Sequence, residues 1–261
     1  SFTGLPKYES GMLISYSVKE QTVPSNYTMS ITGTTITNTY APDKTSVSVT
    51  KVWDDSSNQD GIRPSSVTVK LFADGTYTGQ YKTLDADNSW TATFADLNKK
   101  SGGVDIVYTV VEDTVPGYTT NITGTAAAGY TVTNSHTPEK TSVSVTKVWD
   151  DSLDQDGKRA SYGVTLYADG TAVGSEVTLT KTDLTYTWTN LPKYKNGGTL
   201  IKYTVKETTV PDGYTEEITG TAATGYTVTN SHTPETVGIP FTKIWDDSSD
   251  AAGERPASII V

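Results

Sequence analysis

The sequence predicts an all-β protein, built as a tandem array of immunoglobulin-like β-sandwich repeats. Apolar and polar residues alternate with a period of two in short segments, and turn signals such as Ala73-Asp74-Gly75 separate these segments. No segment has convincing helical periodicity. The segment TSVSVTKVWDD occurs at 45–55 and again at 141–151, so one folding unit repeats along the chain. Several short strands in a repeat of about 96 residues are typical of an antiparallel β-sandwich.

The composition narrows the classes of function. Five tryptophans and 16 tyrosines among 261 residues supply enough core material to exclude wholesale disorder. A net charge of −10 argues against nucleic acid or an anionic membrane as partner, and no apolar run approaches the ~20 residues of a membrane span. The absence of cysteine excludes disulfides and thiolate chemistry, and two histidines are too few for a histidine-rich metal centre. We therefore expect no cofactor and no metal site.

Three sequence blocks recur in the same order and divide the chain into four parts. The blocks are TKxWDD, Y-[ST]-V-x-E and a closing TN segment. We expect the C-terminal part of an incomplete repeat at 1–43, complete repeats at 44–139 and 140–235, and the N-terminal part of another repeat at 236–261. Short proline-containing joints separate these parts, which predicts semi-rigid linkers.

The first strand of each repeat directs a lysine toward the apolar side. Val47 and Val49 share one parity with Lys51, whereas serine and threonine occupy the alternate positions. Lys147 has the same place in the second complete repeat, and Lys243 has it in the closing segment.

The Y-[ST]-V-x-E block directs a glutamate toward the same side. Tyr108 and Val110 lead by alternate positions to Glu112. Glu207 ends the same block in the second complete repeat, and Glu20 ends it in the opening segment.

The closing strand of each repeat directs an asparagine toward the apolar side. Tyr130 and Val132 lead to Asn134, and the equivalent residues are Asn230 and, in the opening segment, Asn38. Each complete repeat therefore turns one lysine, one glutamate and one asparagine inward from three separate strands.

Two interpretations of these inward polar residues are open. Because burial of an isolated charge costs several kcal/mol, the lysine and glutamate require compensation, and a buried salt bridge with the asparagine as hydrogen-bond partner provides it. Alternatively, burial leaves both groups neutral, so that the amine attacks the asparagine carbonyl while the protonated glutamic acid polarises it. The product of that reaction is a Lys–Asn isopeptide bond.

The blocks VTKVWDD, YTVxE and VTN, in this order and spacing, resemble the Cna B-type repeats of Gram-positive surface proteins and pilins. The resemblance covers essentially the whole chain. It implies that the first-strand lysine bonds to the last-strand asparagine with the acidic residue as catalyst. The implied bonds join Lys51 to Asn134 and Lys147 to Asn230, with Glu112 and Glu207 as the catalysts. Glu20, Asn38 and Lys243 belong to incomplete sites.

The acidic loop at 54–61 could suggest a calcium site, but the spacing of its acidic residues does not match that of a calcium-binding loop. With Asp60 at position five of an EF-hand loop, positions one and twelve fall on Ser56 and Val67. We therefore expect an aspartate-stabilised turn. His136 and His232 each occur once per repeat in NSHTP, and we expect solvent-exposed linker residues there.

The function predicted from these observations is structural. We expect a stalk segment of a bacterial cell-surface adhesin or pilin, extracellular and attached to the cell wall through a segment outside this chain. It is not a turnover enzyme, because its one reactive set of residues consumes itself. The alternative is an adhesive module that binds a host ligand of unknown identity through exposed faces. The expected partners are neighbouring repeats of the chain and, if the end segments of two copies meet, a head-to-tail neighbour in which Lys243 approaches Asn38 and Glu20.

Overall fold

The computed structural model describes all 261 residues and contains strands, turns and irregular segments but no helix. The all-β prediction is therefore confirmed. The chain divides into two compact units, Ser1–Glu139 with Lys193–Leu200, and Lys140–Pro192 with Ile201–Val261. No helix is present that could cross a membrane.

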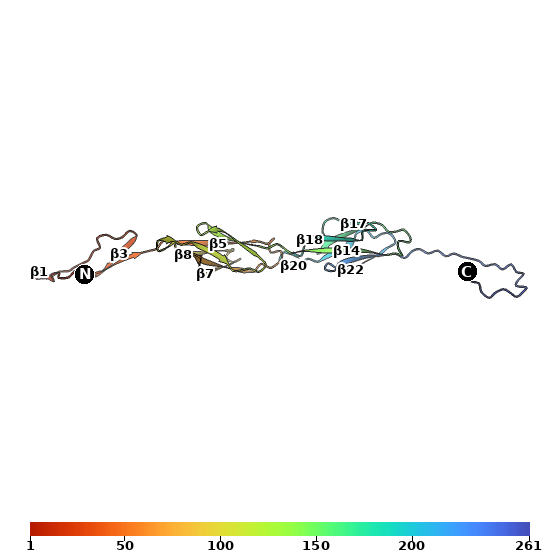
Figure 1. Ribbon diagram of the computed structural model, residues 1–261, viewed down its shortest axis with the longest axis horizontal. Helices are drawn as coiled ribbons and strands as arrows, with labels where there is room; N and C mark the ends of the chain where they lie inside the picture. Colours follow the sequence, from red (N-terminus) through yellow and green to blue (C-terminus); the bar gives the residue numbers. More distant parts are fainter. The chain divides into compact units, whose positions relative to one another are not determined.

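The first unit contains one complete sandwich of two facing sheets (Figure 1). One sheet has the strand order β12-β13-β5-β8, and the other has the order β11-β6-β7. The strands of the first sheet are β5 (Lys44–Asp54), β8 (Thr91–Asn98), β12 (Thr119–Thr125) and β13 (Gly129–Ser135). Those of the second are β6 (Ser66–Ala73), β7 (Thr76–Asp85) and β11 (Tyr108–Glu112). A short hairpin, β9 (Lys100–Ser101) and β10 (Val104–Asp105), precedes β11.

The first and last strands of this sandwich are neighbours and run parallel. β13 pairs with β5 in a register that places Val132 opposite Lys51 and Asn134 opposite Trp53. The start of β13 requires a glycine, because Gly129 has a φ of +93°, a conformation that residues with a side chain rarely adopt, and a Cβ there would also lie 2.5 Å from Ser48 Oγ of β5. The two ends of the repeat are thereby held side by side.

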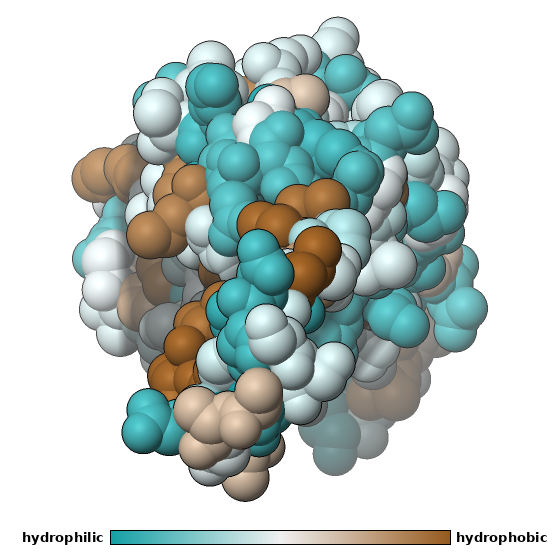
Figure 2. All heavy atoms as spheres, turned by 90° about the vertical axis from the view of Figure 1, so that its right-hand side faces the viewer, coloured by the Kyte–Doolittle hydropathy of each residue, from teal (hydrophilic) through white to brown (hydrophobic).

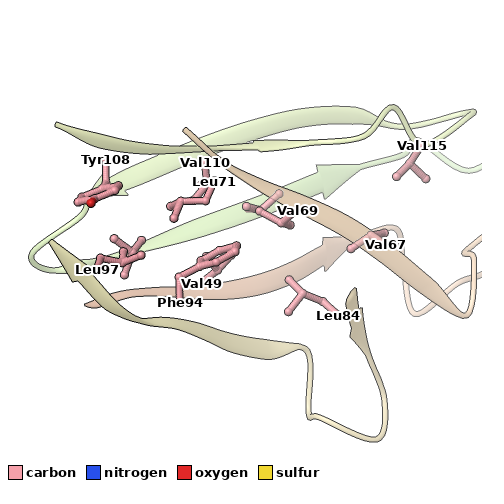
Figure 3. Packing of buried hydrophobic residues seen from close by; sticks show 12 residues of the cluster. Val49, Val67, Val69, Leu71, Leu84, Phe94, Leu97, Tyr108, Val110 and Val115 are labelled. Atoms are coloured by element: carbon pink, nitrogen blue, oxygen red, sulfur yellow. The ribbon is translucent and has the colours of Figure 1, made fainter. Parts of the chain in front are cut away.

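The space between the sheets is filled by aliphatic and aromatic side chains from both faces (Figure 3). Val49 and Phe94 of one sheet meet Val69 and Leu71 of the other, and all four are almost inaccessible to solvent. Each such side chain contributes about 1.5–3 kcal/mol through burial. The alternation of these residues with polar ones explains why each strand has one inward face.

The second unit repeats this arrangement. One sheet has the order β18-β14-β23-β22, with β14 and β23 parallel as in the first repeat, and β15 in the other sheet pairs with β16, β17 and β21. The strands of the first sheet are β14 (Lys140–Asp150), β18 (Thr185–Pro192), β22 (Thr215–Thr221) and β23 (Gly225–Ser231). Those of the second are β15 (Tyr162–Ala168), β16 (Thr171–Ala172), β17 (Val177–Leu179) and β21 (Tyr203–Glu207). The short hairpin of β19 (Tyr194–Lys195) and β20 (Thr199–Leu200) belongs to the first compact unit.

The end segments have less regular structure. Residues 1–43 contain the pairs β1 (Tyr8–Glu9) with β2 (Met12–Leu13), and β3 (Tyr27–Thr32) with β4 (Thr35–Tyr40). Residues 236–261 contain no strand, and Ile239 and Phe241 are exposed there. Hydrophobic residues also reach the surface among hydrophilic ones in the view of Figure 2.

Candidate functional site

Lys51 lies inside the first sandwich although its side chain is charged at neutral pH in water. It is on the inward face of β5 and only 4% exposed. Its Nζ donates to Val52 O at 3.1 Å and to Val132 O at 3.2 Å. The amine also lies 4.3 Å from the centroid of the Trp53 ring, whose face attracts a cation.

Glu112 reaches the same place from the opposite sheet, where it ends β11. Its Oε1 lies 3.5 Å from Lys51 Nζ and accepts no hydrogen bond. Its Oε2 accepts a hydrogen bond of 2.9 Å from Thr120 Oγ1. The carboxyl group is therefore held by its outer oxygen, while its inner oxygen faces the amine.

Asn134 completes the set from β13. The residue is fully buried, and neither its Oδ1 nor its Nδ2 has a hydrogen-bond partner. A buried polar group without a partner typically costs about 1–3 kcal/mol, so this amide is unusual in a well-packed core. Since Lys51 is opposite Val132, Asn134 is its diagonal neighbour on the same face, within reach of a lysine side chain.

The surroundings favour the neutral form of the Lys51 amine. Desolvation by burial is the largest effect and outweighs the opposing charge of Glu112, so that the pKa of Lys51 falls from 10.5 to about 8. About a tenth of the amines are then neutral at pH 7, against roughly 1 in 3,000 at the ordinary pKa. A neutral amine is the form that can act as a nucleophile.

The second complete repeat assembles the equivalent residues more tightly. Lys147 Nζ lies 2.8 Å from Glu207 Oε1, and the same oxygen accepts a hydrogen bond of 3.0 Å from Asn230 Nδ2. Glu207 Oε2 and Asn230 Oδ1 are buried without hydrogen-bond partners. Burial again lowers the pKa of Lys147, although the hydrogen bond to Glu207 and the charge of Glu207 act to raise it.

The residues of the incomplete sites do not form a triad. Asn38 Nδ2 donates to Glu20 Oε1 at 2.9 Å within residues 1–43. Lys243 is exposed, and its Nζ donates to Ile244 O.

Thr120 is a site residue that the sequence patterns did not single out. It lies opposite Asn134 in the β12–β13 pair and shares its parity with Ile122, which packs against the core. This parity could have indicated that Thr120 faces inward. Threonine is, however, so common in edge strands that the parity alone does not mark it as a site residue.

The acidic loop forms the aspartate-stabilised turn that its sequence predicts. Asp55 is buried, accepts two hydrogen bonds from Arg63, and accepts others from Tyr118 Oη and the backbone N–H of Asn58. Desolvation alone would raise the pKa of Asp55, but the bonds from Arg63, Asn58 and Tyr118 lower it to about 2. Asp151 and Arg159 form the same pair in the second repeat.

The expectation that the histidines are solvent-exposed linker residues is wrong. The side chain of His136 is only 16% exposed and that of His232 only 9%. His136 Nε2 donates to Asp60 Oδ2 at 2.8 Å, and Nδ1 donates to Gly117 O at 2.9 Å. His232 makes the equivalent bonds to Asp156 and Gly213. Each histidine thus links the segment that follows the last strand of its repeat to the acidic loop of the same repeat.

The fold and the buried triads together define a tandem β-sandwich repeat protein whose modules share one internal polar site. A family model described as the Cna protein B-type domain matches residues 1–39, 47–135 and 143–231. The chain therefore belongs to the Cna B-type domain family, as its sequence blocks indicate.

Relatives of known identity agree with this assignment. The chain is 45% identical over 262 aligned positions to a collagen adhesin of Staphylococcus aureus, an alignment that covers 100% of this chain and 22% of that protein. The chain thus spans about a fifth of the length of that curated relative. Its structure is similar to the crystal structure of two B repeat units of the collagen-binding protein Cna of Staphylococcus aureus. The TM-score is 0.64 and the identity 44%, with coverage of 98% of this chain and 67% of that chain.

Proposed function

We propose that this chain is a stalk segment of a bacterial cell-surface adhesin or pilin, stiffened by isopeptide bonds between Lys51 and Asn134 and between Lys147 and Asn230. The observation that carries the proposal is the buried lysine, glutamate and asparagine in both complete repeats. The surface location rests on the family and on the collagen adhesin to which the chain is similar. The proposed modules are 44–139 and 140–235, flanked by the partial repeats 1–43 and 236–261.

The chemistry proposed for the first repeat is a single acyl transfer. Lys51 passes a proton to Glu112, and the neutral amine attacks Cγ of Asn134. Protonated Glu112 donates to Asn134 Oδ1, which stabilises the negative charge that develops on that oxygen. A proton from the attacking nitrogen then reaches the amide nitrogen through the carboxyl group, the C–N bond breaks, and ammonia leaves. One amide has replaced another, and the protein loses about 17 Da for each bond formed.

The position of the proposed bond suits a stalk. β5 and β13 are the first and last strands of the repeat and lie next to each other in parallel. A covalent link between them passes tension from one to the other without loading the remaining strands. It also closes a loop from residue 51 to residue 134, which is 84 residues. By the chain-entropy argument for cross-links, this closure stabilises the repeat by about 4–5 kcal/mol.

Single-molecule force spectroscopy tests the mechanical function. In the unmutated chain, the residues between each lysine and its asparagine should stay locked under load. In Lys51→Met, the first repeat should release roughly 280 Å of additional contour length, since 84 extended residues span about 3.4 Å each. Release of this length by the unmutated chain would contradict the proposed function.

A further inference from the structure

We infer that Thr120 is a positioning residue for the isopeptide reaction of the first repeat: its hydroxyl holds one carboxyl oxygen of Glu112, so that the other oxygen stays beside Lys51 and Asn134 without a tight hydrogen bond to either before the proton transfer. This inference rests on the proposed function. Its first support is the bond of 2.9 Å from Thr120 Oγ1 to Glu112 Oε2.

The second repeat shows the arrangement without this hydroxyl. The position opposite the asparagine is Thr120 in the first repeat and Glu216 in the second. When it is ionised, the Glu216 carboxylate has no hydrogen to donate, so it cannot bind Glu207 as Thr120 binds Glu112. Glu207 Oε2 is buried without a hydrogen-bond partner. The two repeats therefore differ at one contact of the catalytic carboxyl group.

The carboxyl group sits differently in the two repeats. The distance from the lysine Nζ to the carboxylate oxygen is 3.5 Å for Lys51 and Glu112, but 2.8 Å for Lys147 and Glu207. Asn230 also donates to Glu207, whereas Asn134 makes no side-chain hydrogen bond. In the second repeat the carboxylate thus binds both reactants, and in the first repeat it binds neither closely.

These geometries have opposite consequences for reactivity. A tight ion pair favours the charged lysine, which cannot attack a carbonyl group. An asparagine whose nitrogen faces the carboxylate presents the wrong end of its amide to an acid that must donate to Oδ1. The hydroxyl of Thr120 removes both obstacles by binding the carboxyl group from the other side. The first repeat should therefore react faster than the second.

The charges around each lysine determine the pH dependence. Glu112, Asp55 and Arg63 act on Lys51, and Glu207 and Glu216 act on Lys147. Loss of the Thr120 hydroxyl should let Glu112 move closer to Lys51 and raise the pKa of that amine. The pH at which the reaction reaches half its maximal rate should then rise.

The test follows the cross-linking of each repeat separately in the full 261-residue chain. Newly synthesised chain is collected in denaturant before it folds, diluted into buffers between pH 5.5 and pH 9, and quenched with acid at intervals. Proteolysis and mass spectrometry then measure the Lys51–Asn134 and Lys147–Asn230 peptides, so that the second repeat serves as internal reference. We expect Thr120→Val to slow the first repeat roughly tenfold, equivalent to about 1.4 kcal/mol of barrier, and to shift its pH midpoint upward.

Three further variants make the result specific. Thr120→Ser keeps the hydroxyl and should restore the rate and the midpoint, and Thr119→Val changes the neighbouring residue of the opposite parity and should have no effect. Glu216→Thr should accelerate the second repeat, which keeps the test valid if Thr120→Val prevents folding of the first. Unchanged rate and midpoint in Thr120→Val, or no acceleration in Glu216→Thr, would overturn the inference alone. Absence of both cross-linked peptides in the unmutated chain would instead overturn the proposed function.

Discussion

Lys51 and Lys243 occupy almost the same local sequence but opposite environments. In both segments, the lysine Nζ lies 4.3 Å from the ring centroid of the tryptophan two residues later. Lys51, however, is buried against β13 and Glu112, whereas Lys243 is exposed. The short motif alone therefore provides the lysine–tryptophan contact, whereas burial of the amine beside a carboxyl group requires two complete sheets.

The largest expected effect comes from removing the buried lysine. Lys51→Met keeps most of the side-chain volume but has no amine, so it should abolish the proposed bond and leave Glu112 buried without a charged neighbour. Loss of loop closure alone is worth about 4–5 kcal/mol. Because 1 kcal/mol shifts the melting temperature of such a domain by about 4–8 °C, calorimetry should show a drop of roughly 16–40 °C for the first repeat. A melting temperature within a few degrees of the unmutated repeat would contradict the cross-link.

Removal of the carboxyl group should have a smaller effect on the fold. Glu112→Ala should stop the reaction of the first repeat, because the amide is no longer polarised, while the sandwich still forms. Intact mass should then be about 17 Da higher than expected for a chain with both bonds. The second repeat keeps Glu207 and serves as the control. A Glu112→Ala chain that cross-links at the ordinary rate would show that Glu112 has another role.

The histidines should give a modest dependence of stability on pH. The hydrogen bond to Asp60 is the main cause that raises the pKa of His136, and Asp156 does the same for His232. For a raised pKa, the stabilisation is complete below the unfolded value of about 6.5 and is lost as the pH rises through the folded value. The melting temperature should therefore fall as the pH rises above about 6.5, and less steeply in a chain with both His136→Ala and His232→Ala. Equal slopes for the two chains would show that these contacts do not contribute.

The exposed lysine should give the smallest effect of all. Lys243→Ala should leave the mass deficit and the melting temperature of both complete repeats unchanged, since Lys243 contacts neither triad. Mass spectrometry of the variant alongside Lys51→Met provides a direct contrast between an exposed and a buried copy of the motif. A smaller mass deficit in Lys243→Ala would show that the buried triads are not the source of the bonds.

Strand alternation was sufficient to predict the sandwich fold and the inward faces of Lys51, Glu112 and Asn134. It could not show that the lysine and asparagine strands are parallel neighbours, or that the glutamate comes from the facing sheet, because those facts depend on strand order. Alternation does place Thr120 on the inward face of its strand, but an inward threonine is too common to single out as a partner of Glu112. The exposure of His136 was predicted wrongly because its partner, Asp60, is 76 residues away in the sequence.

Intact mass spectrometry of the unmutated 261-residue chain tests the central claim most directly. Two isopeptide bonds require the loss of two molecules of ammonia, so the measured mass should be about 34 Da below the value calculated from the sequence. A measured mass equal to the calculated one would contradict the reaction and leave Lys51 and Lys147 as partners in buried salt bridges.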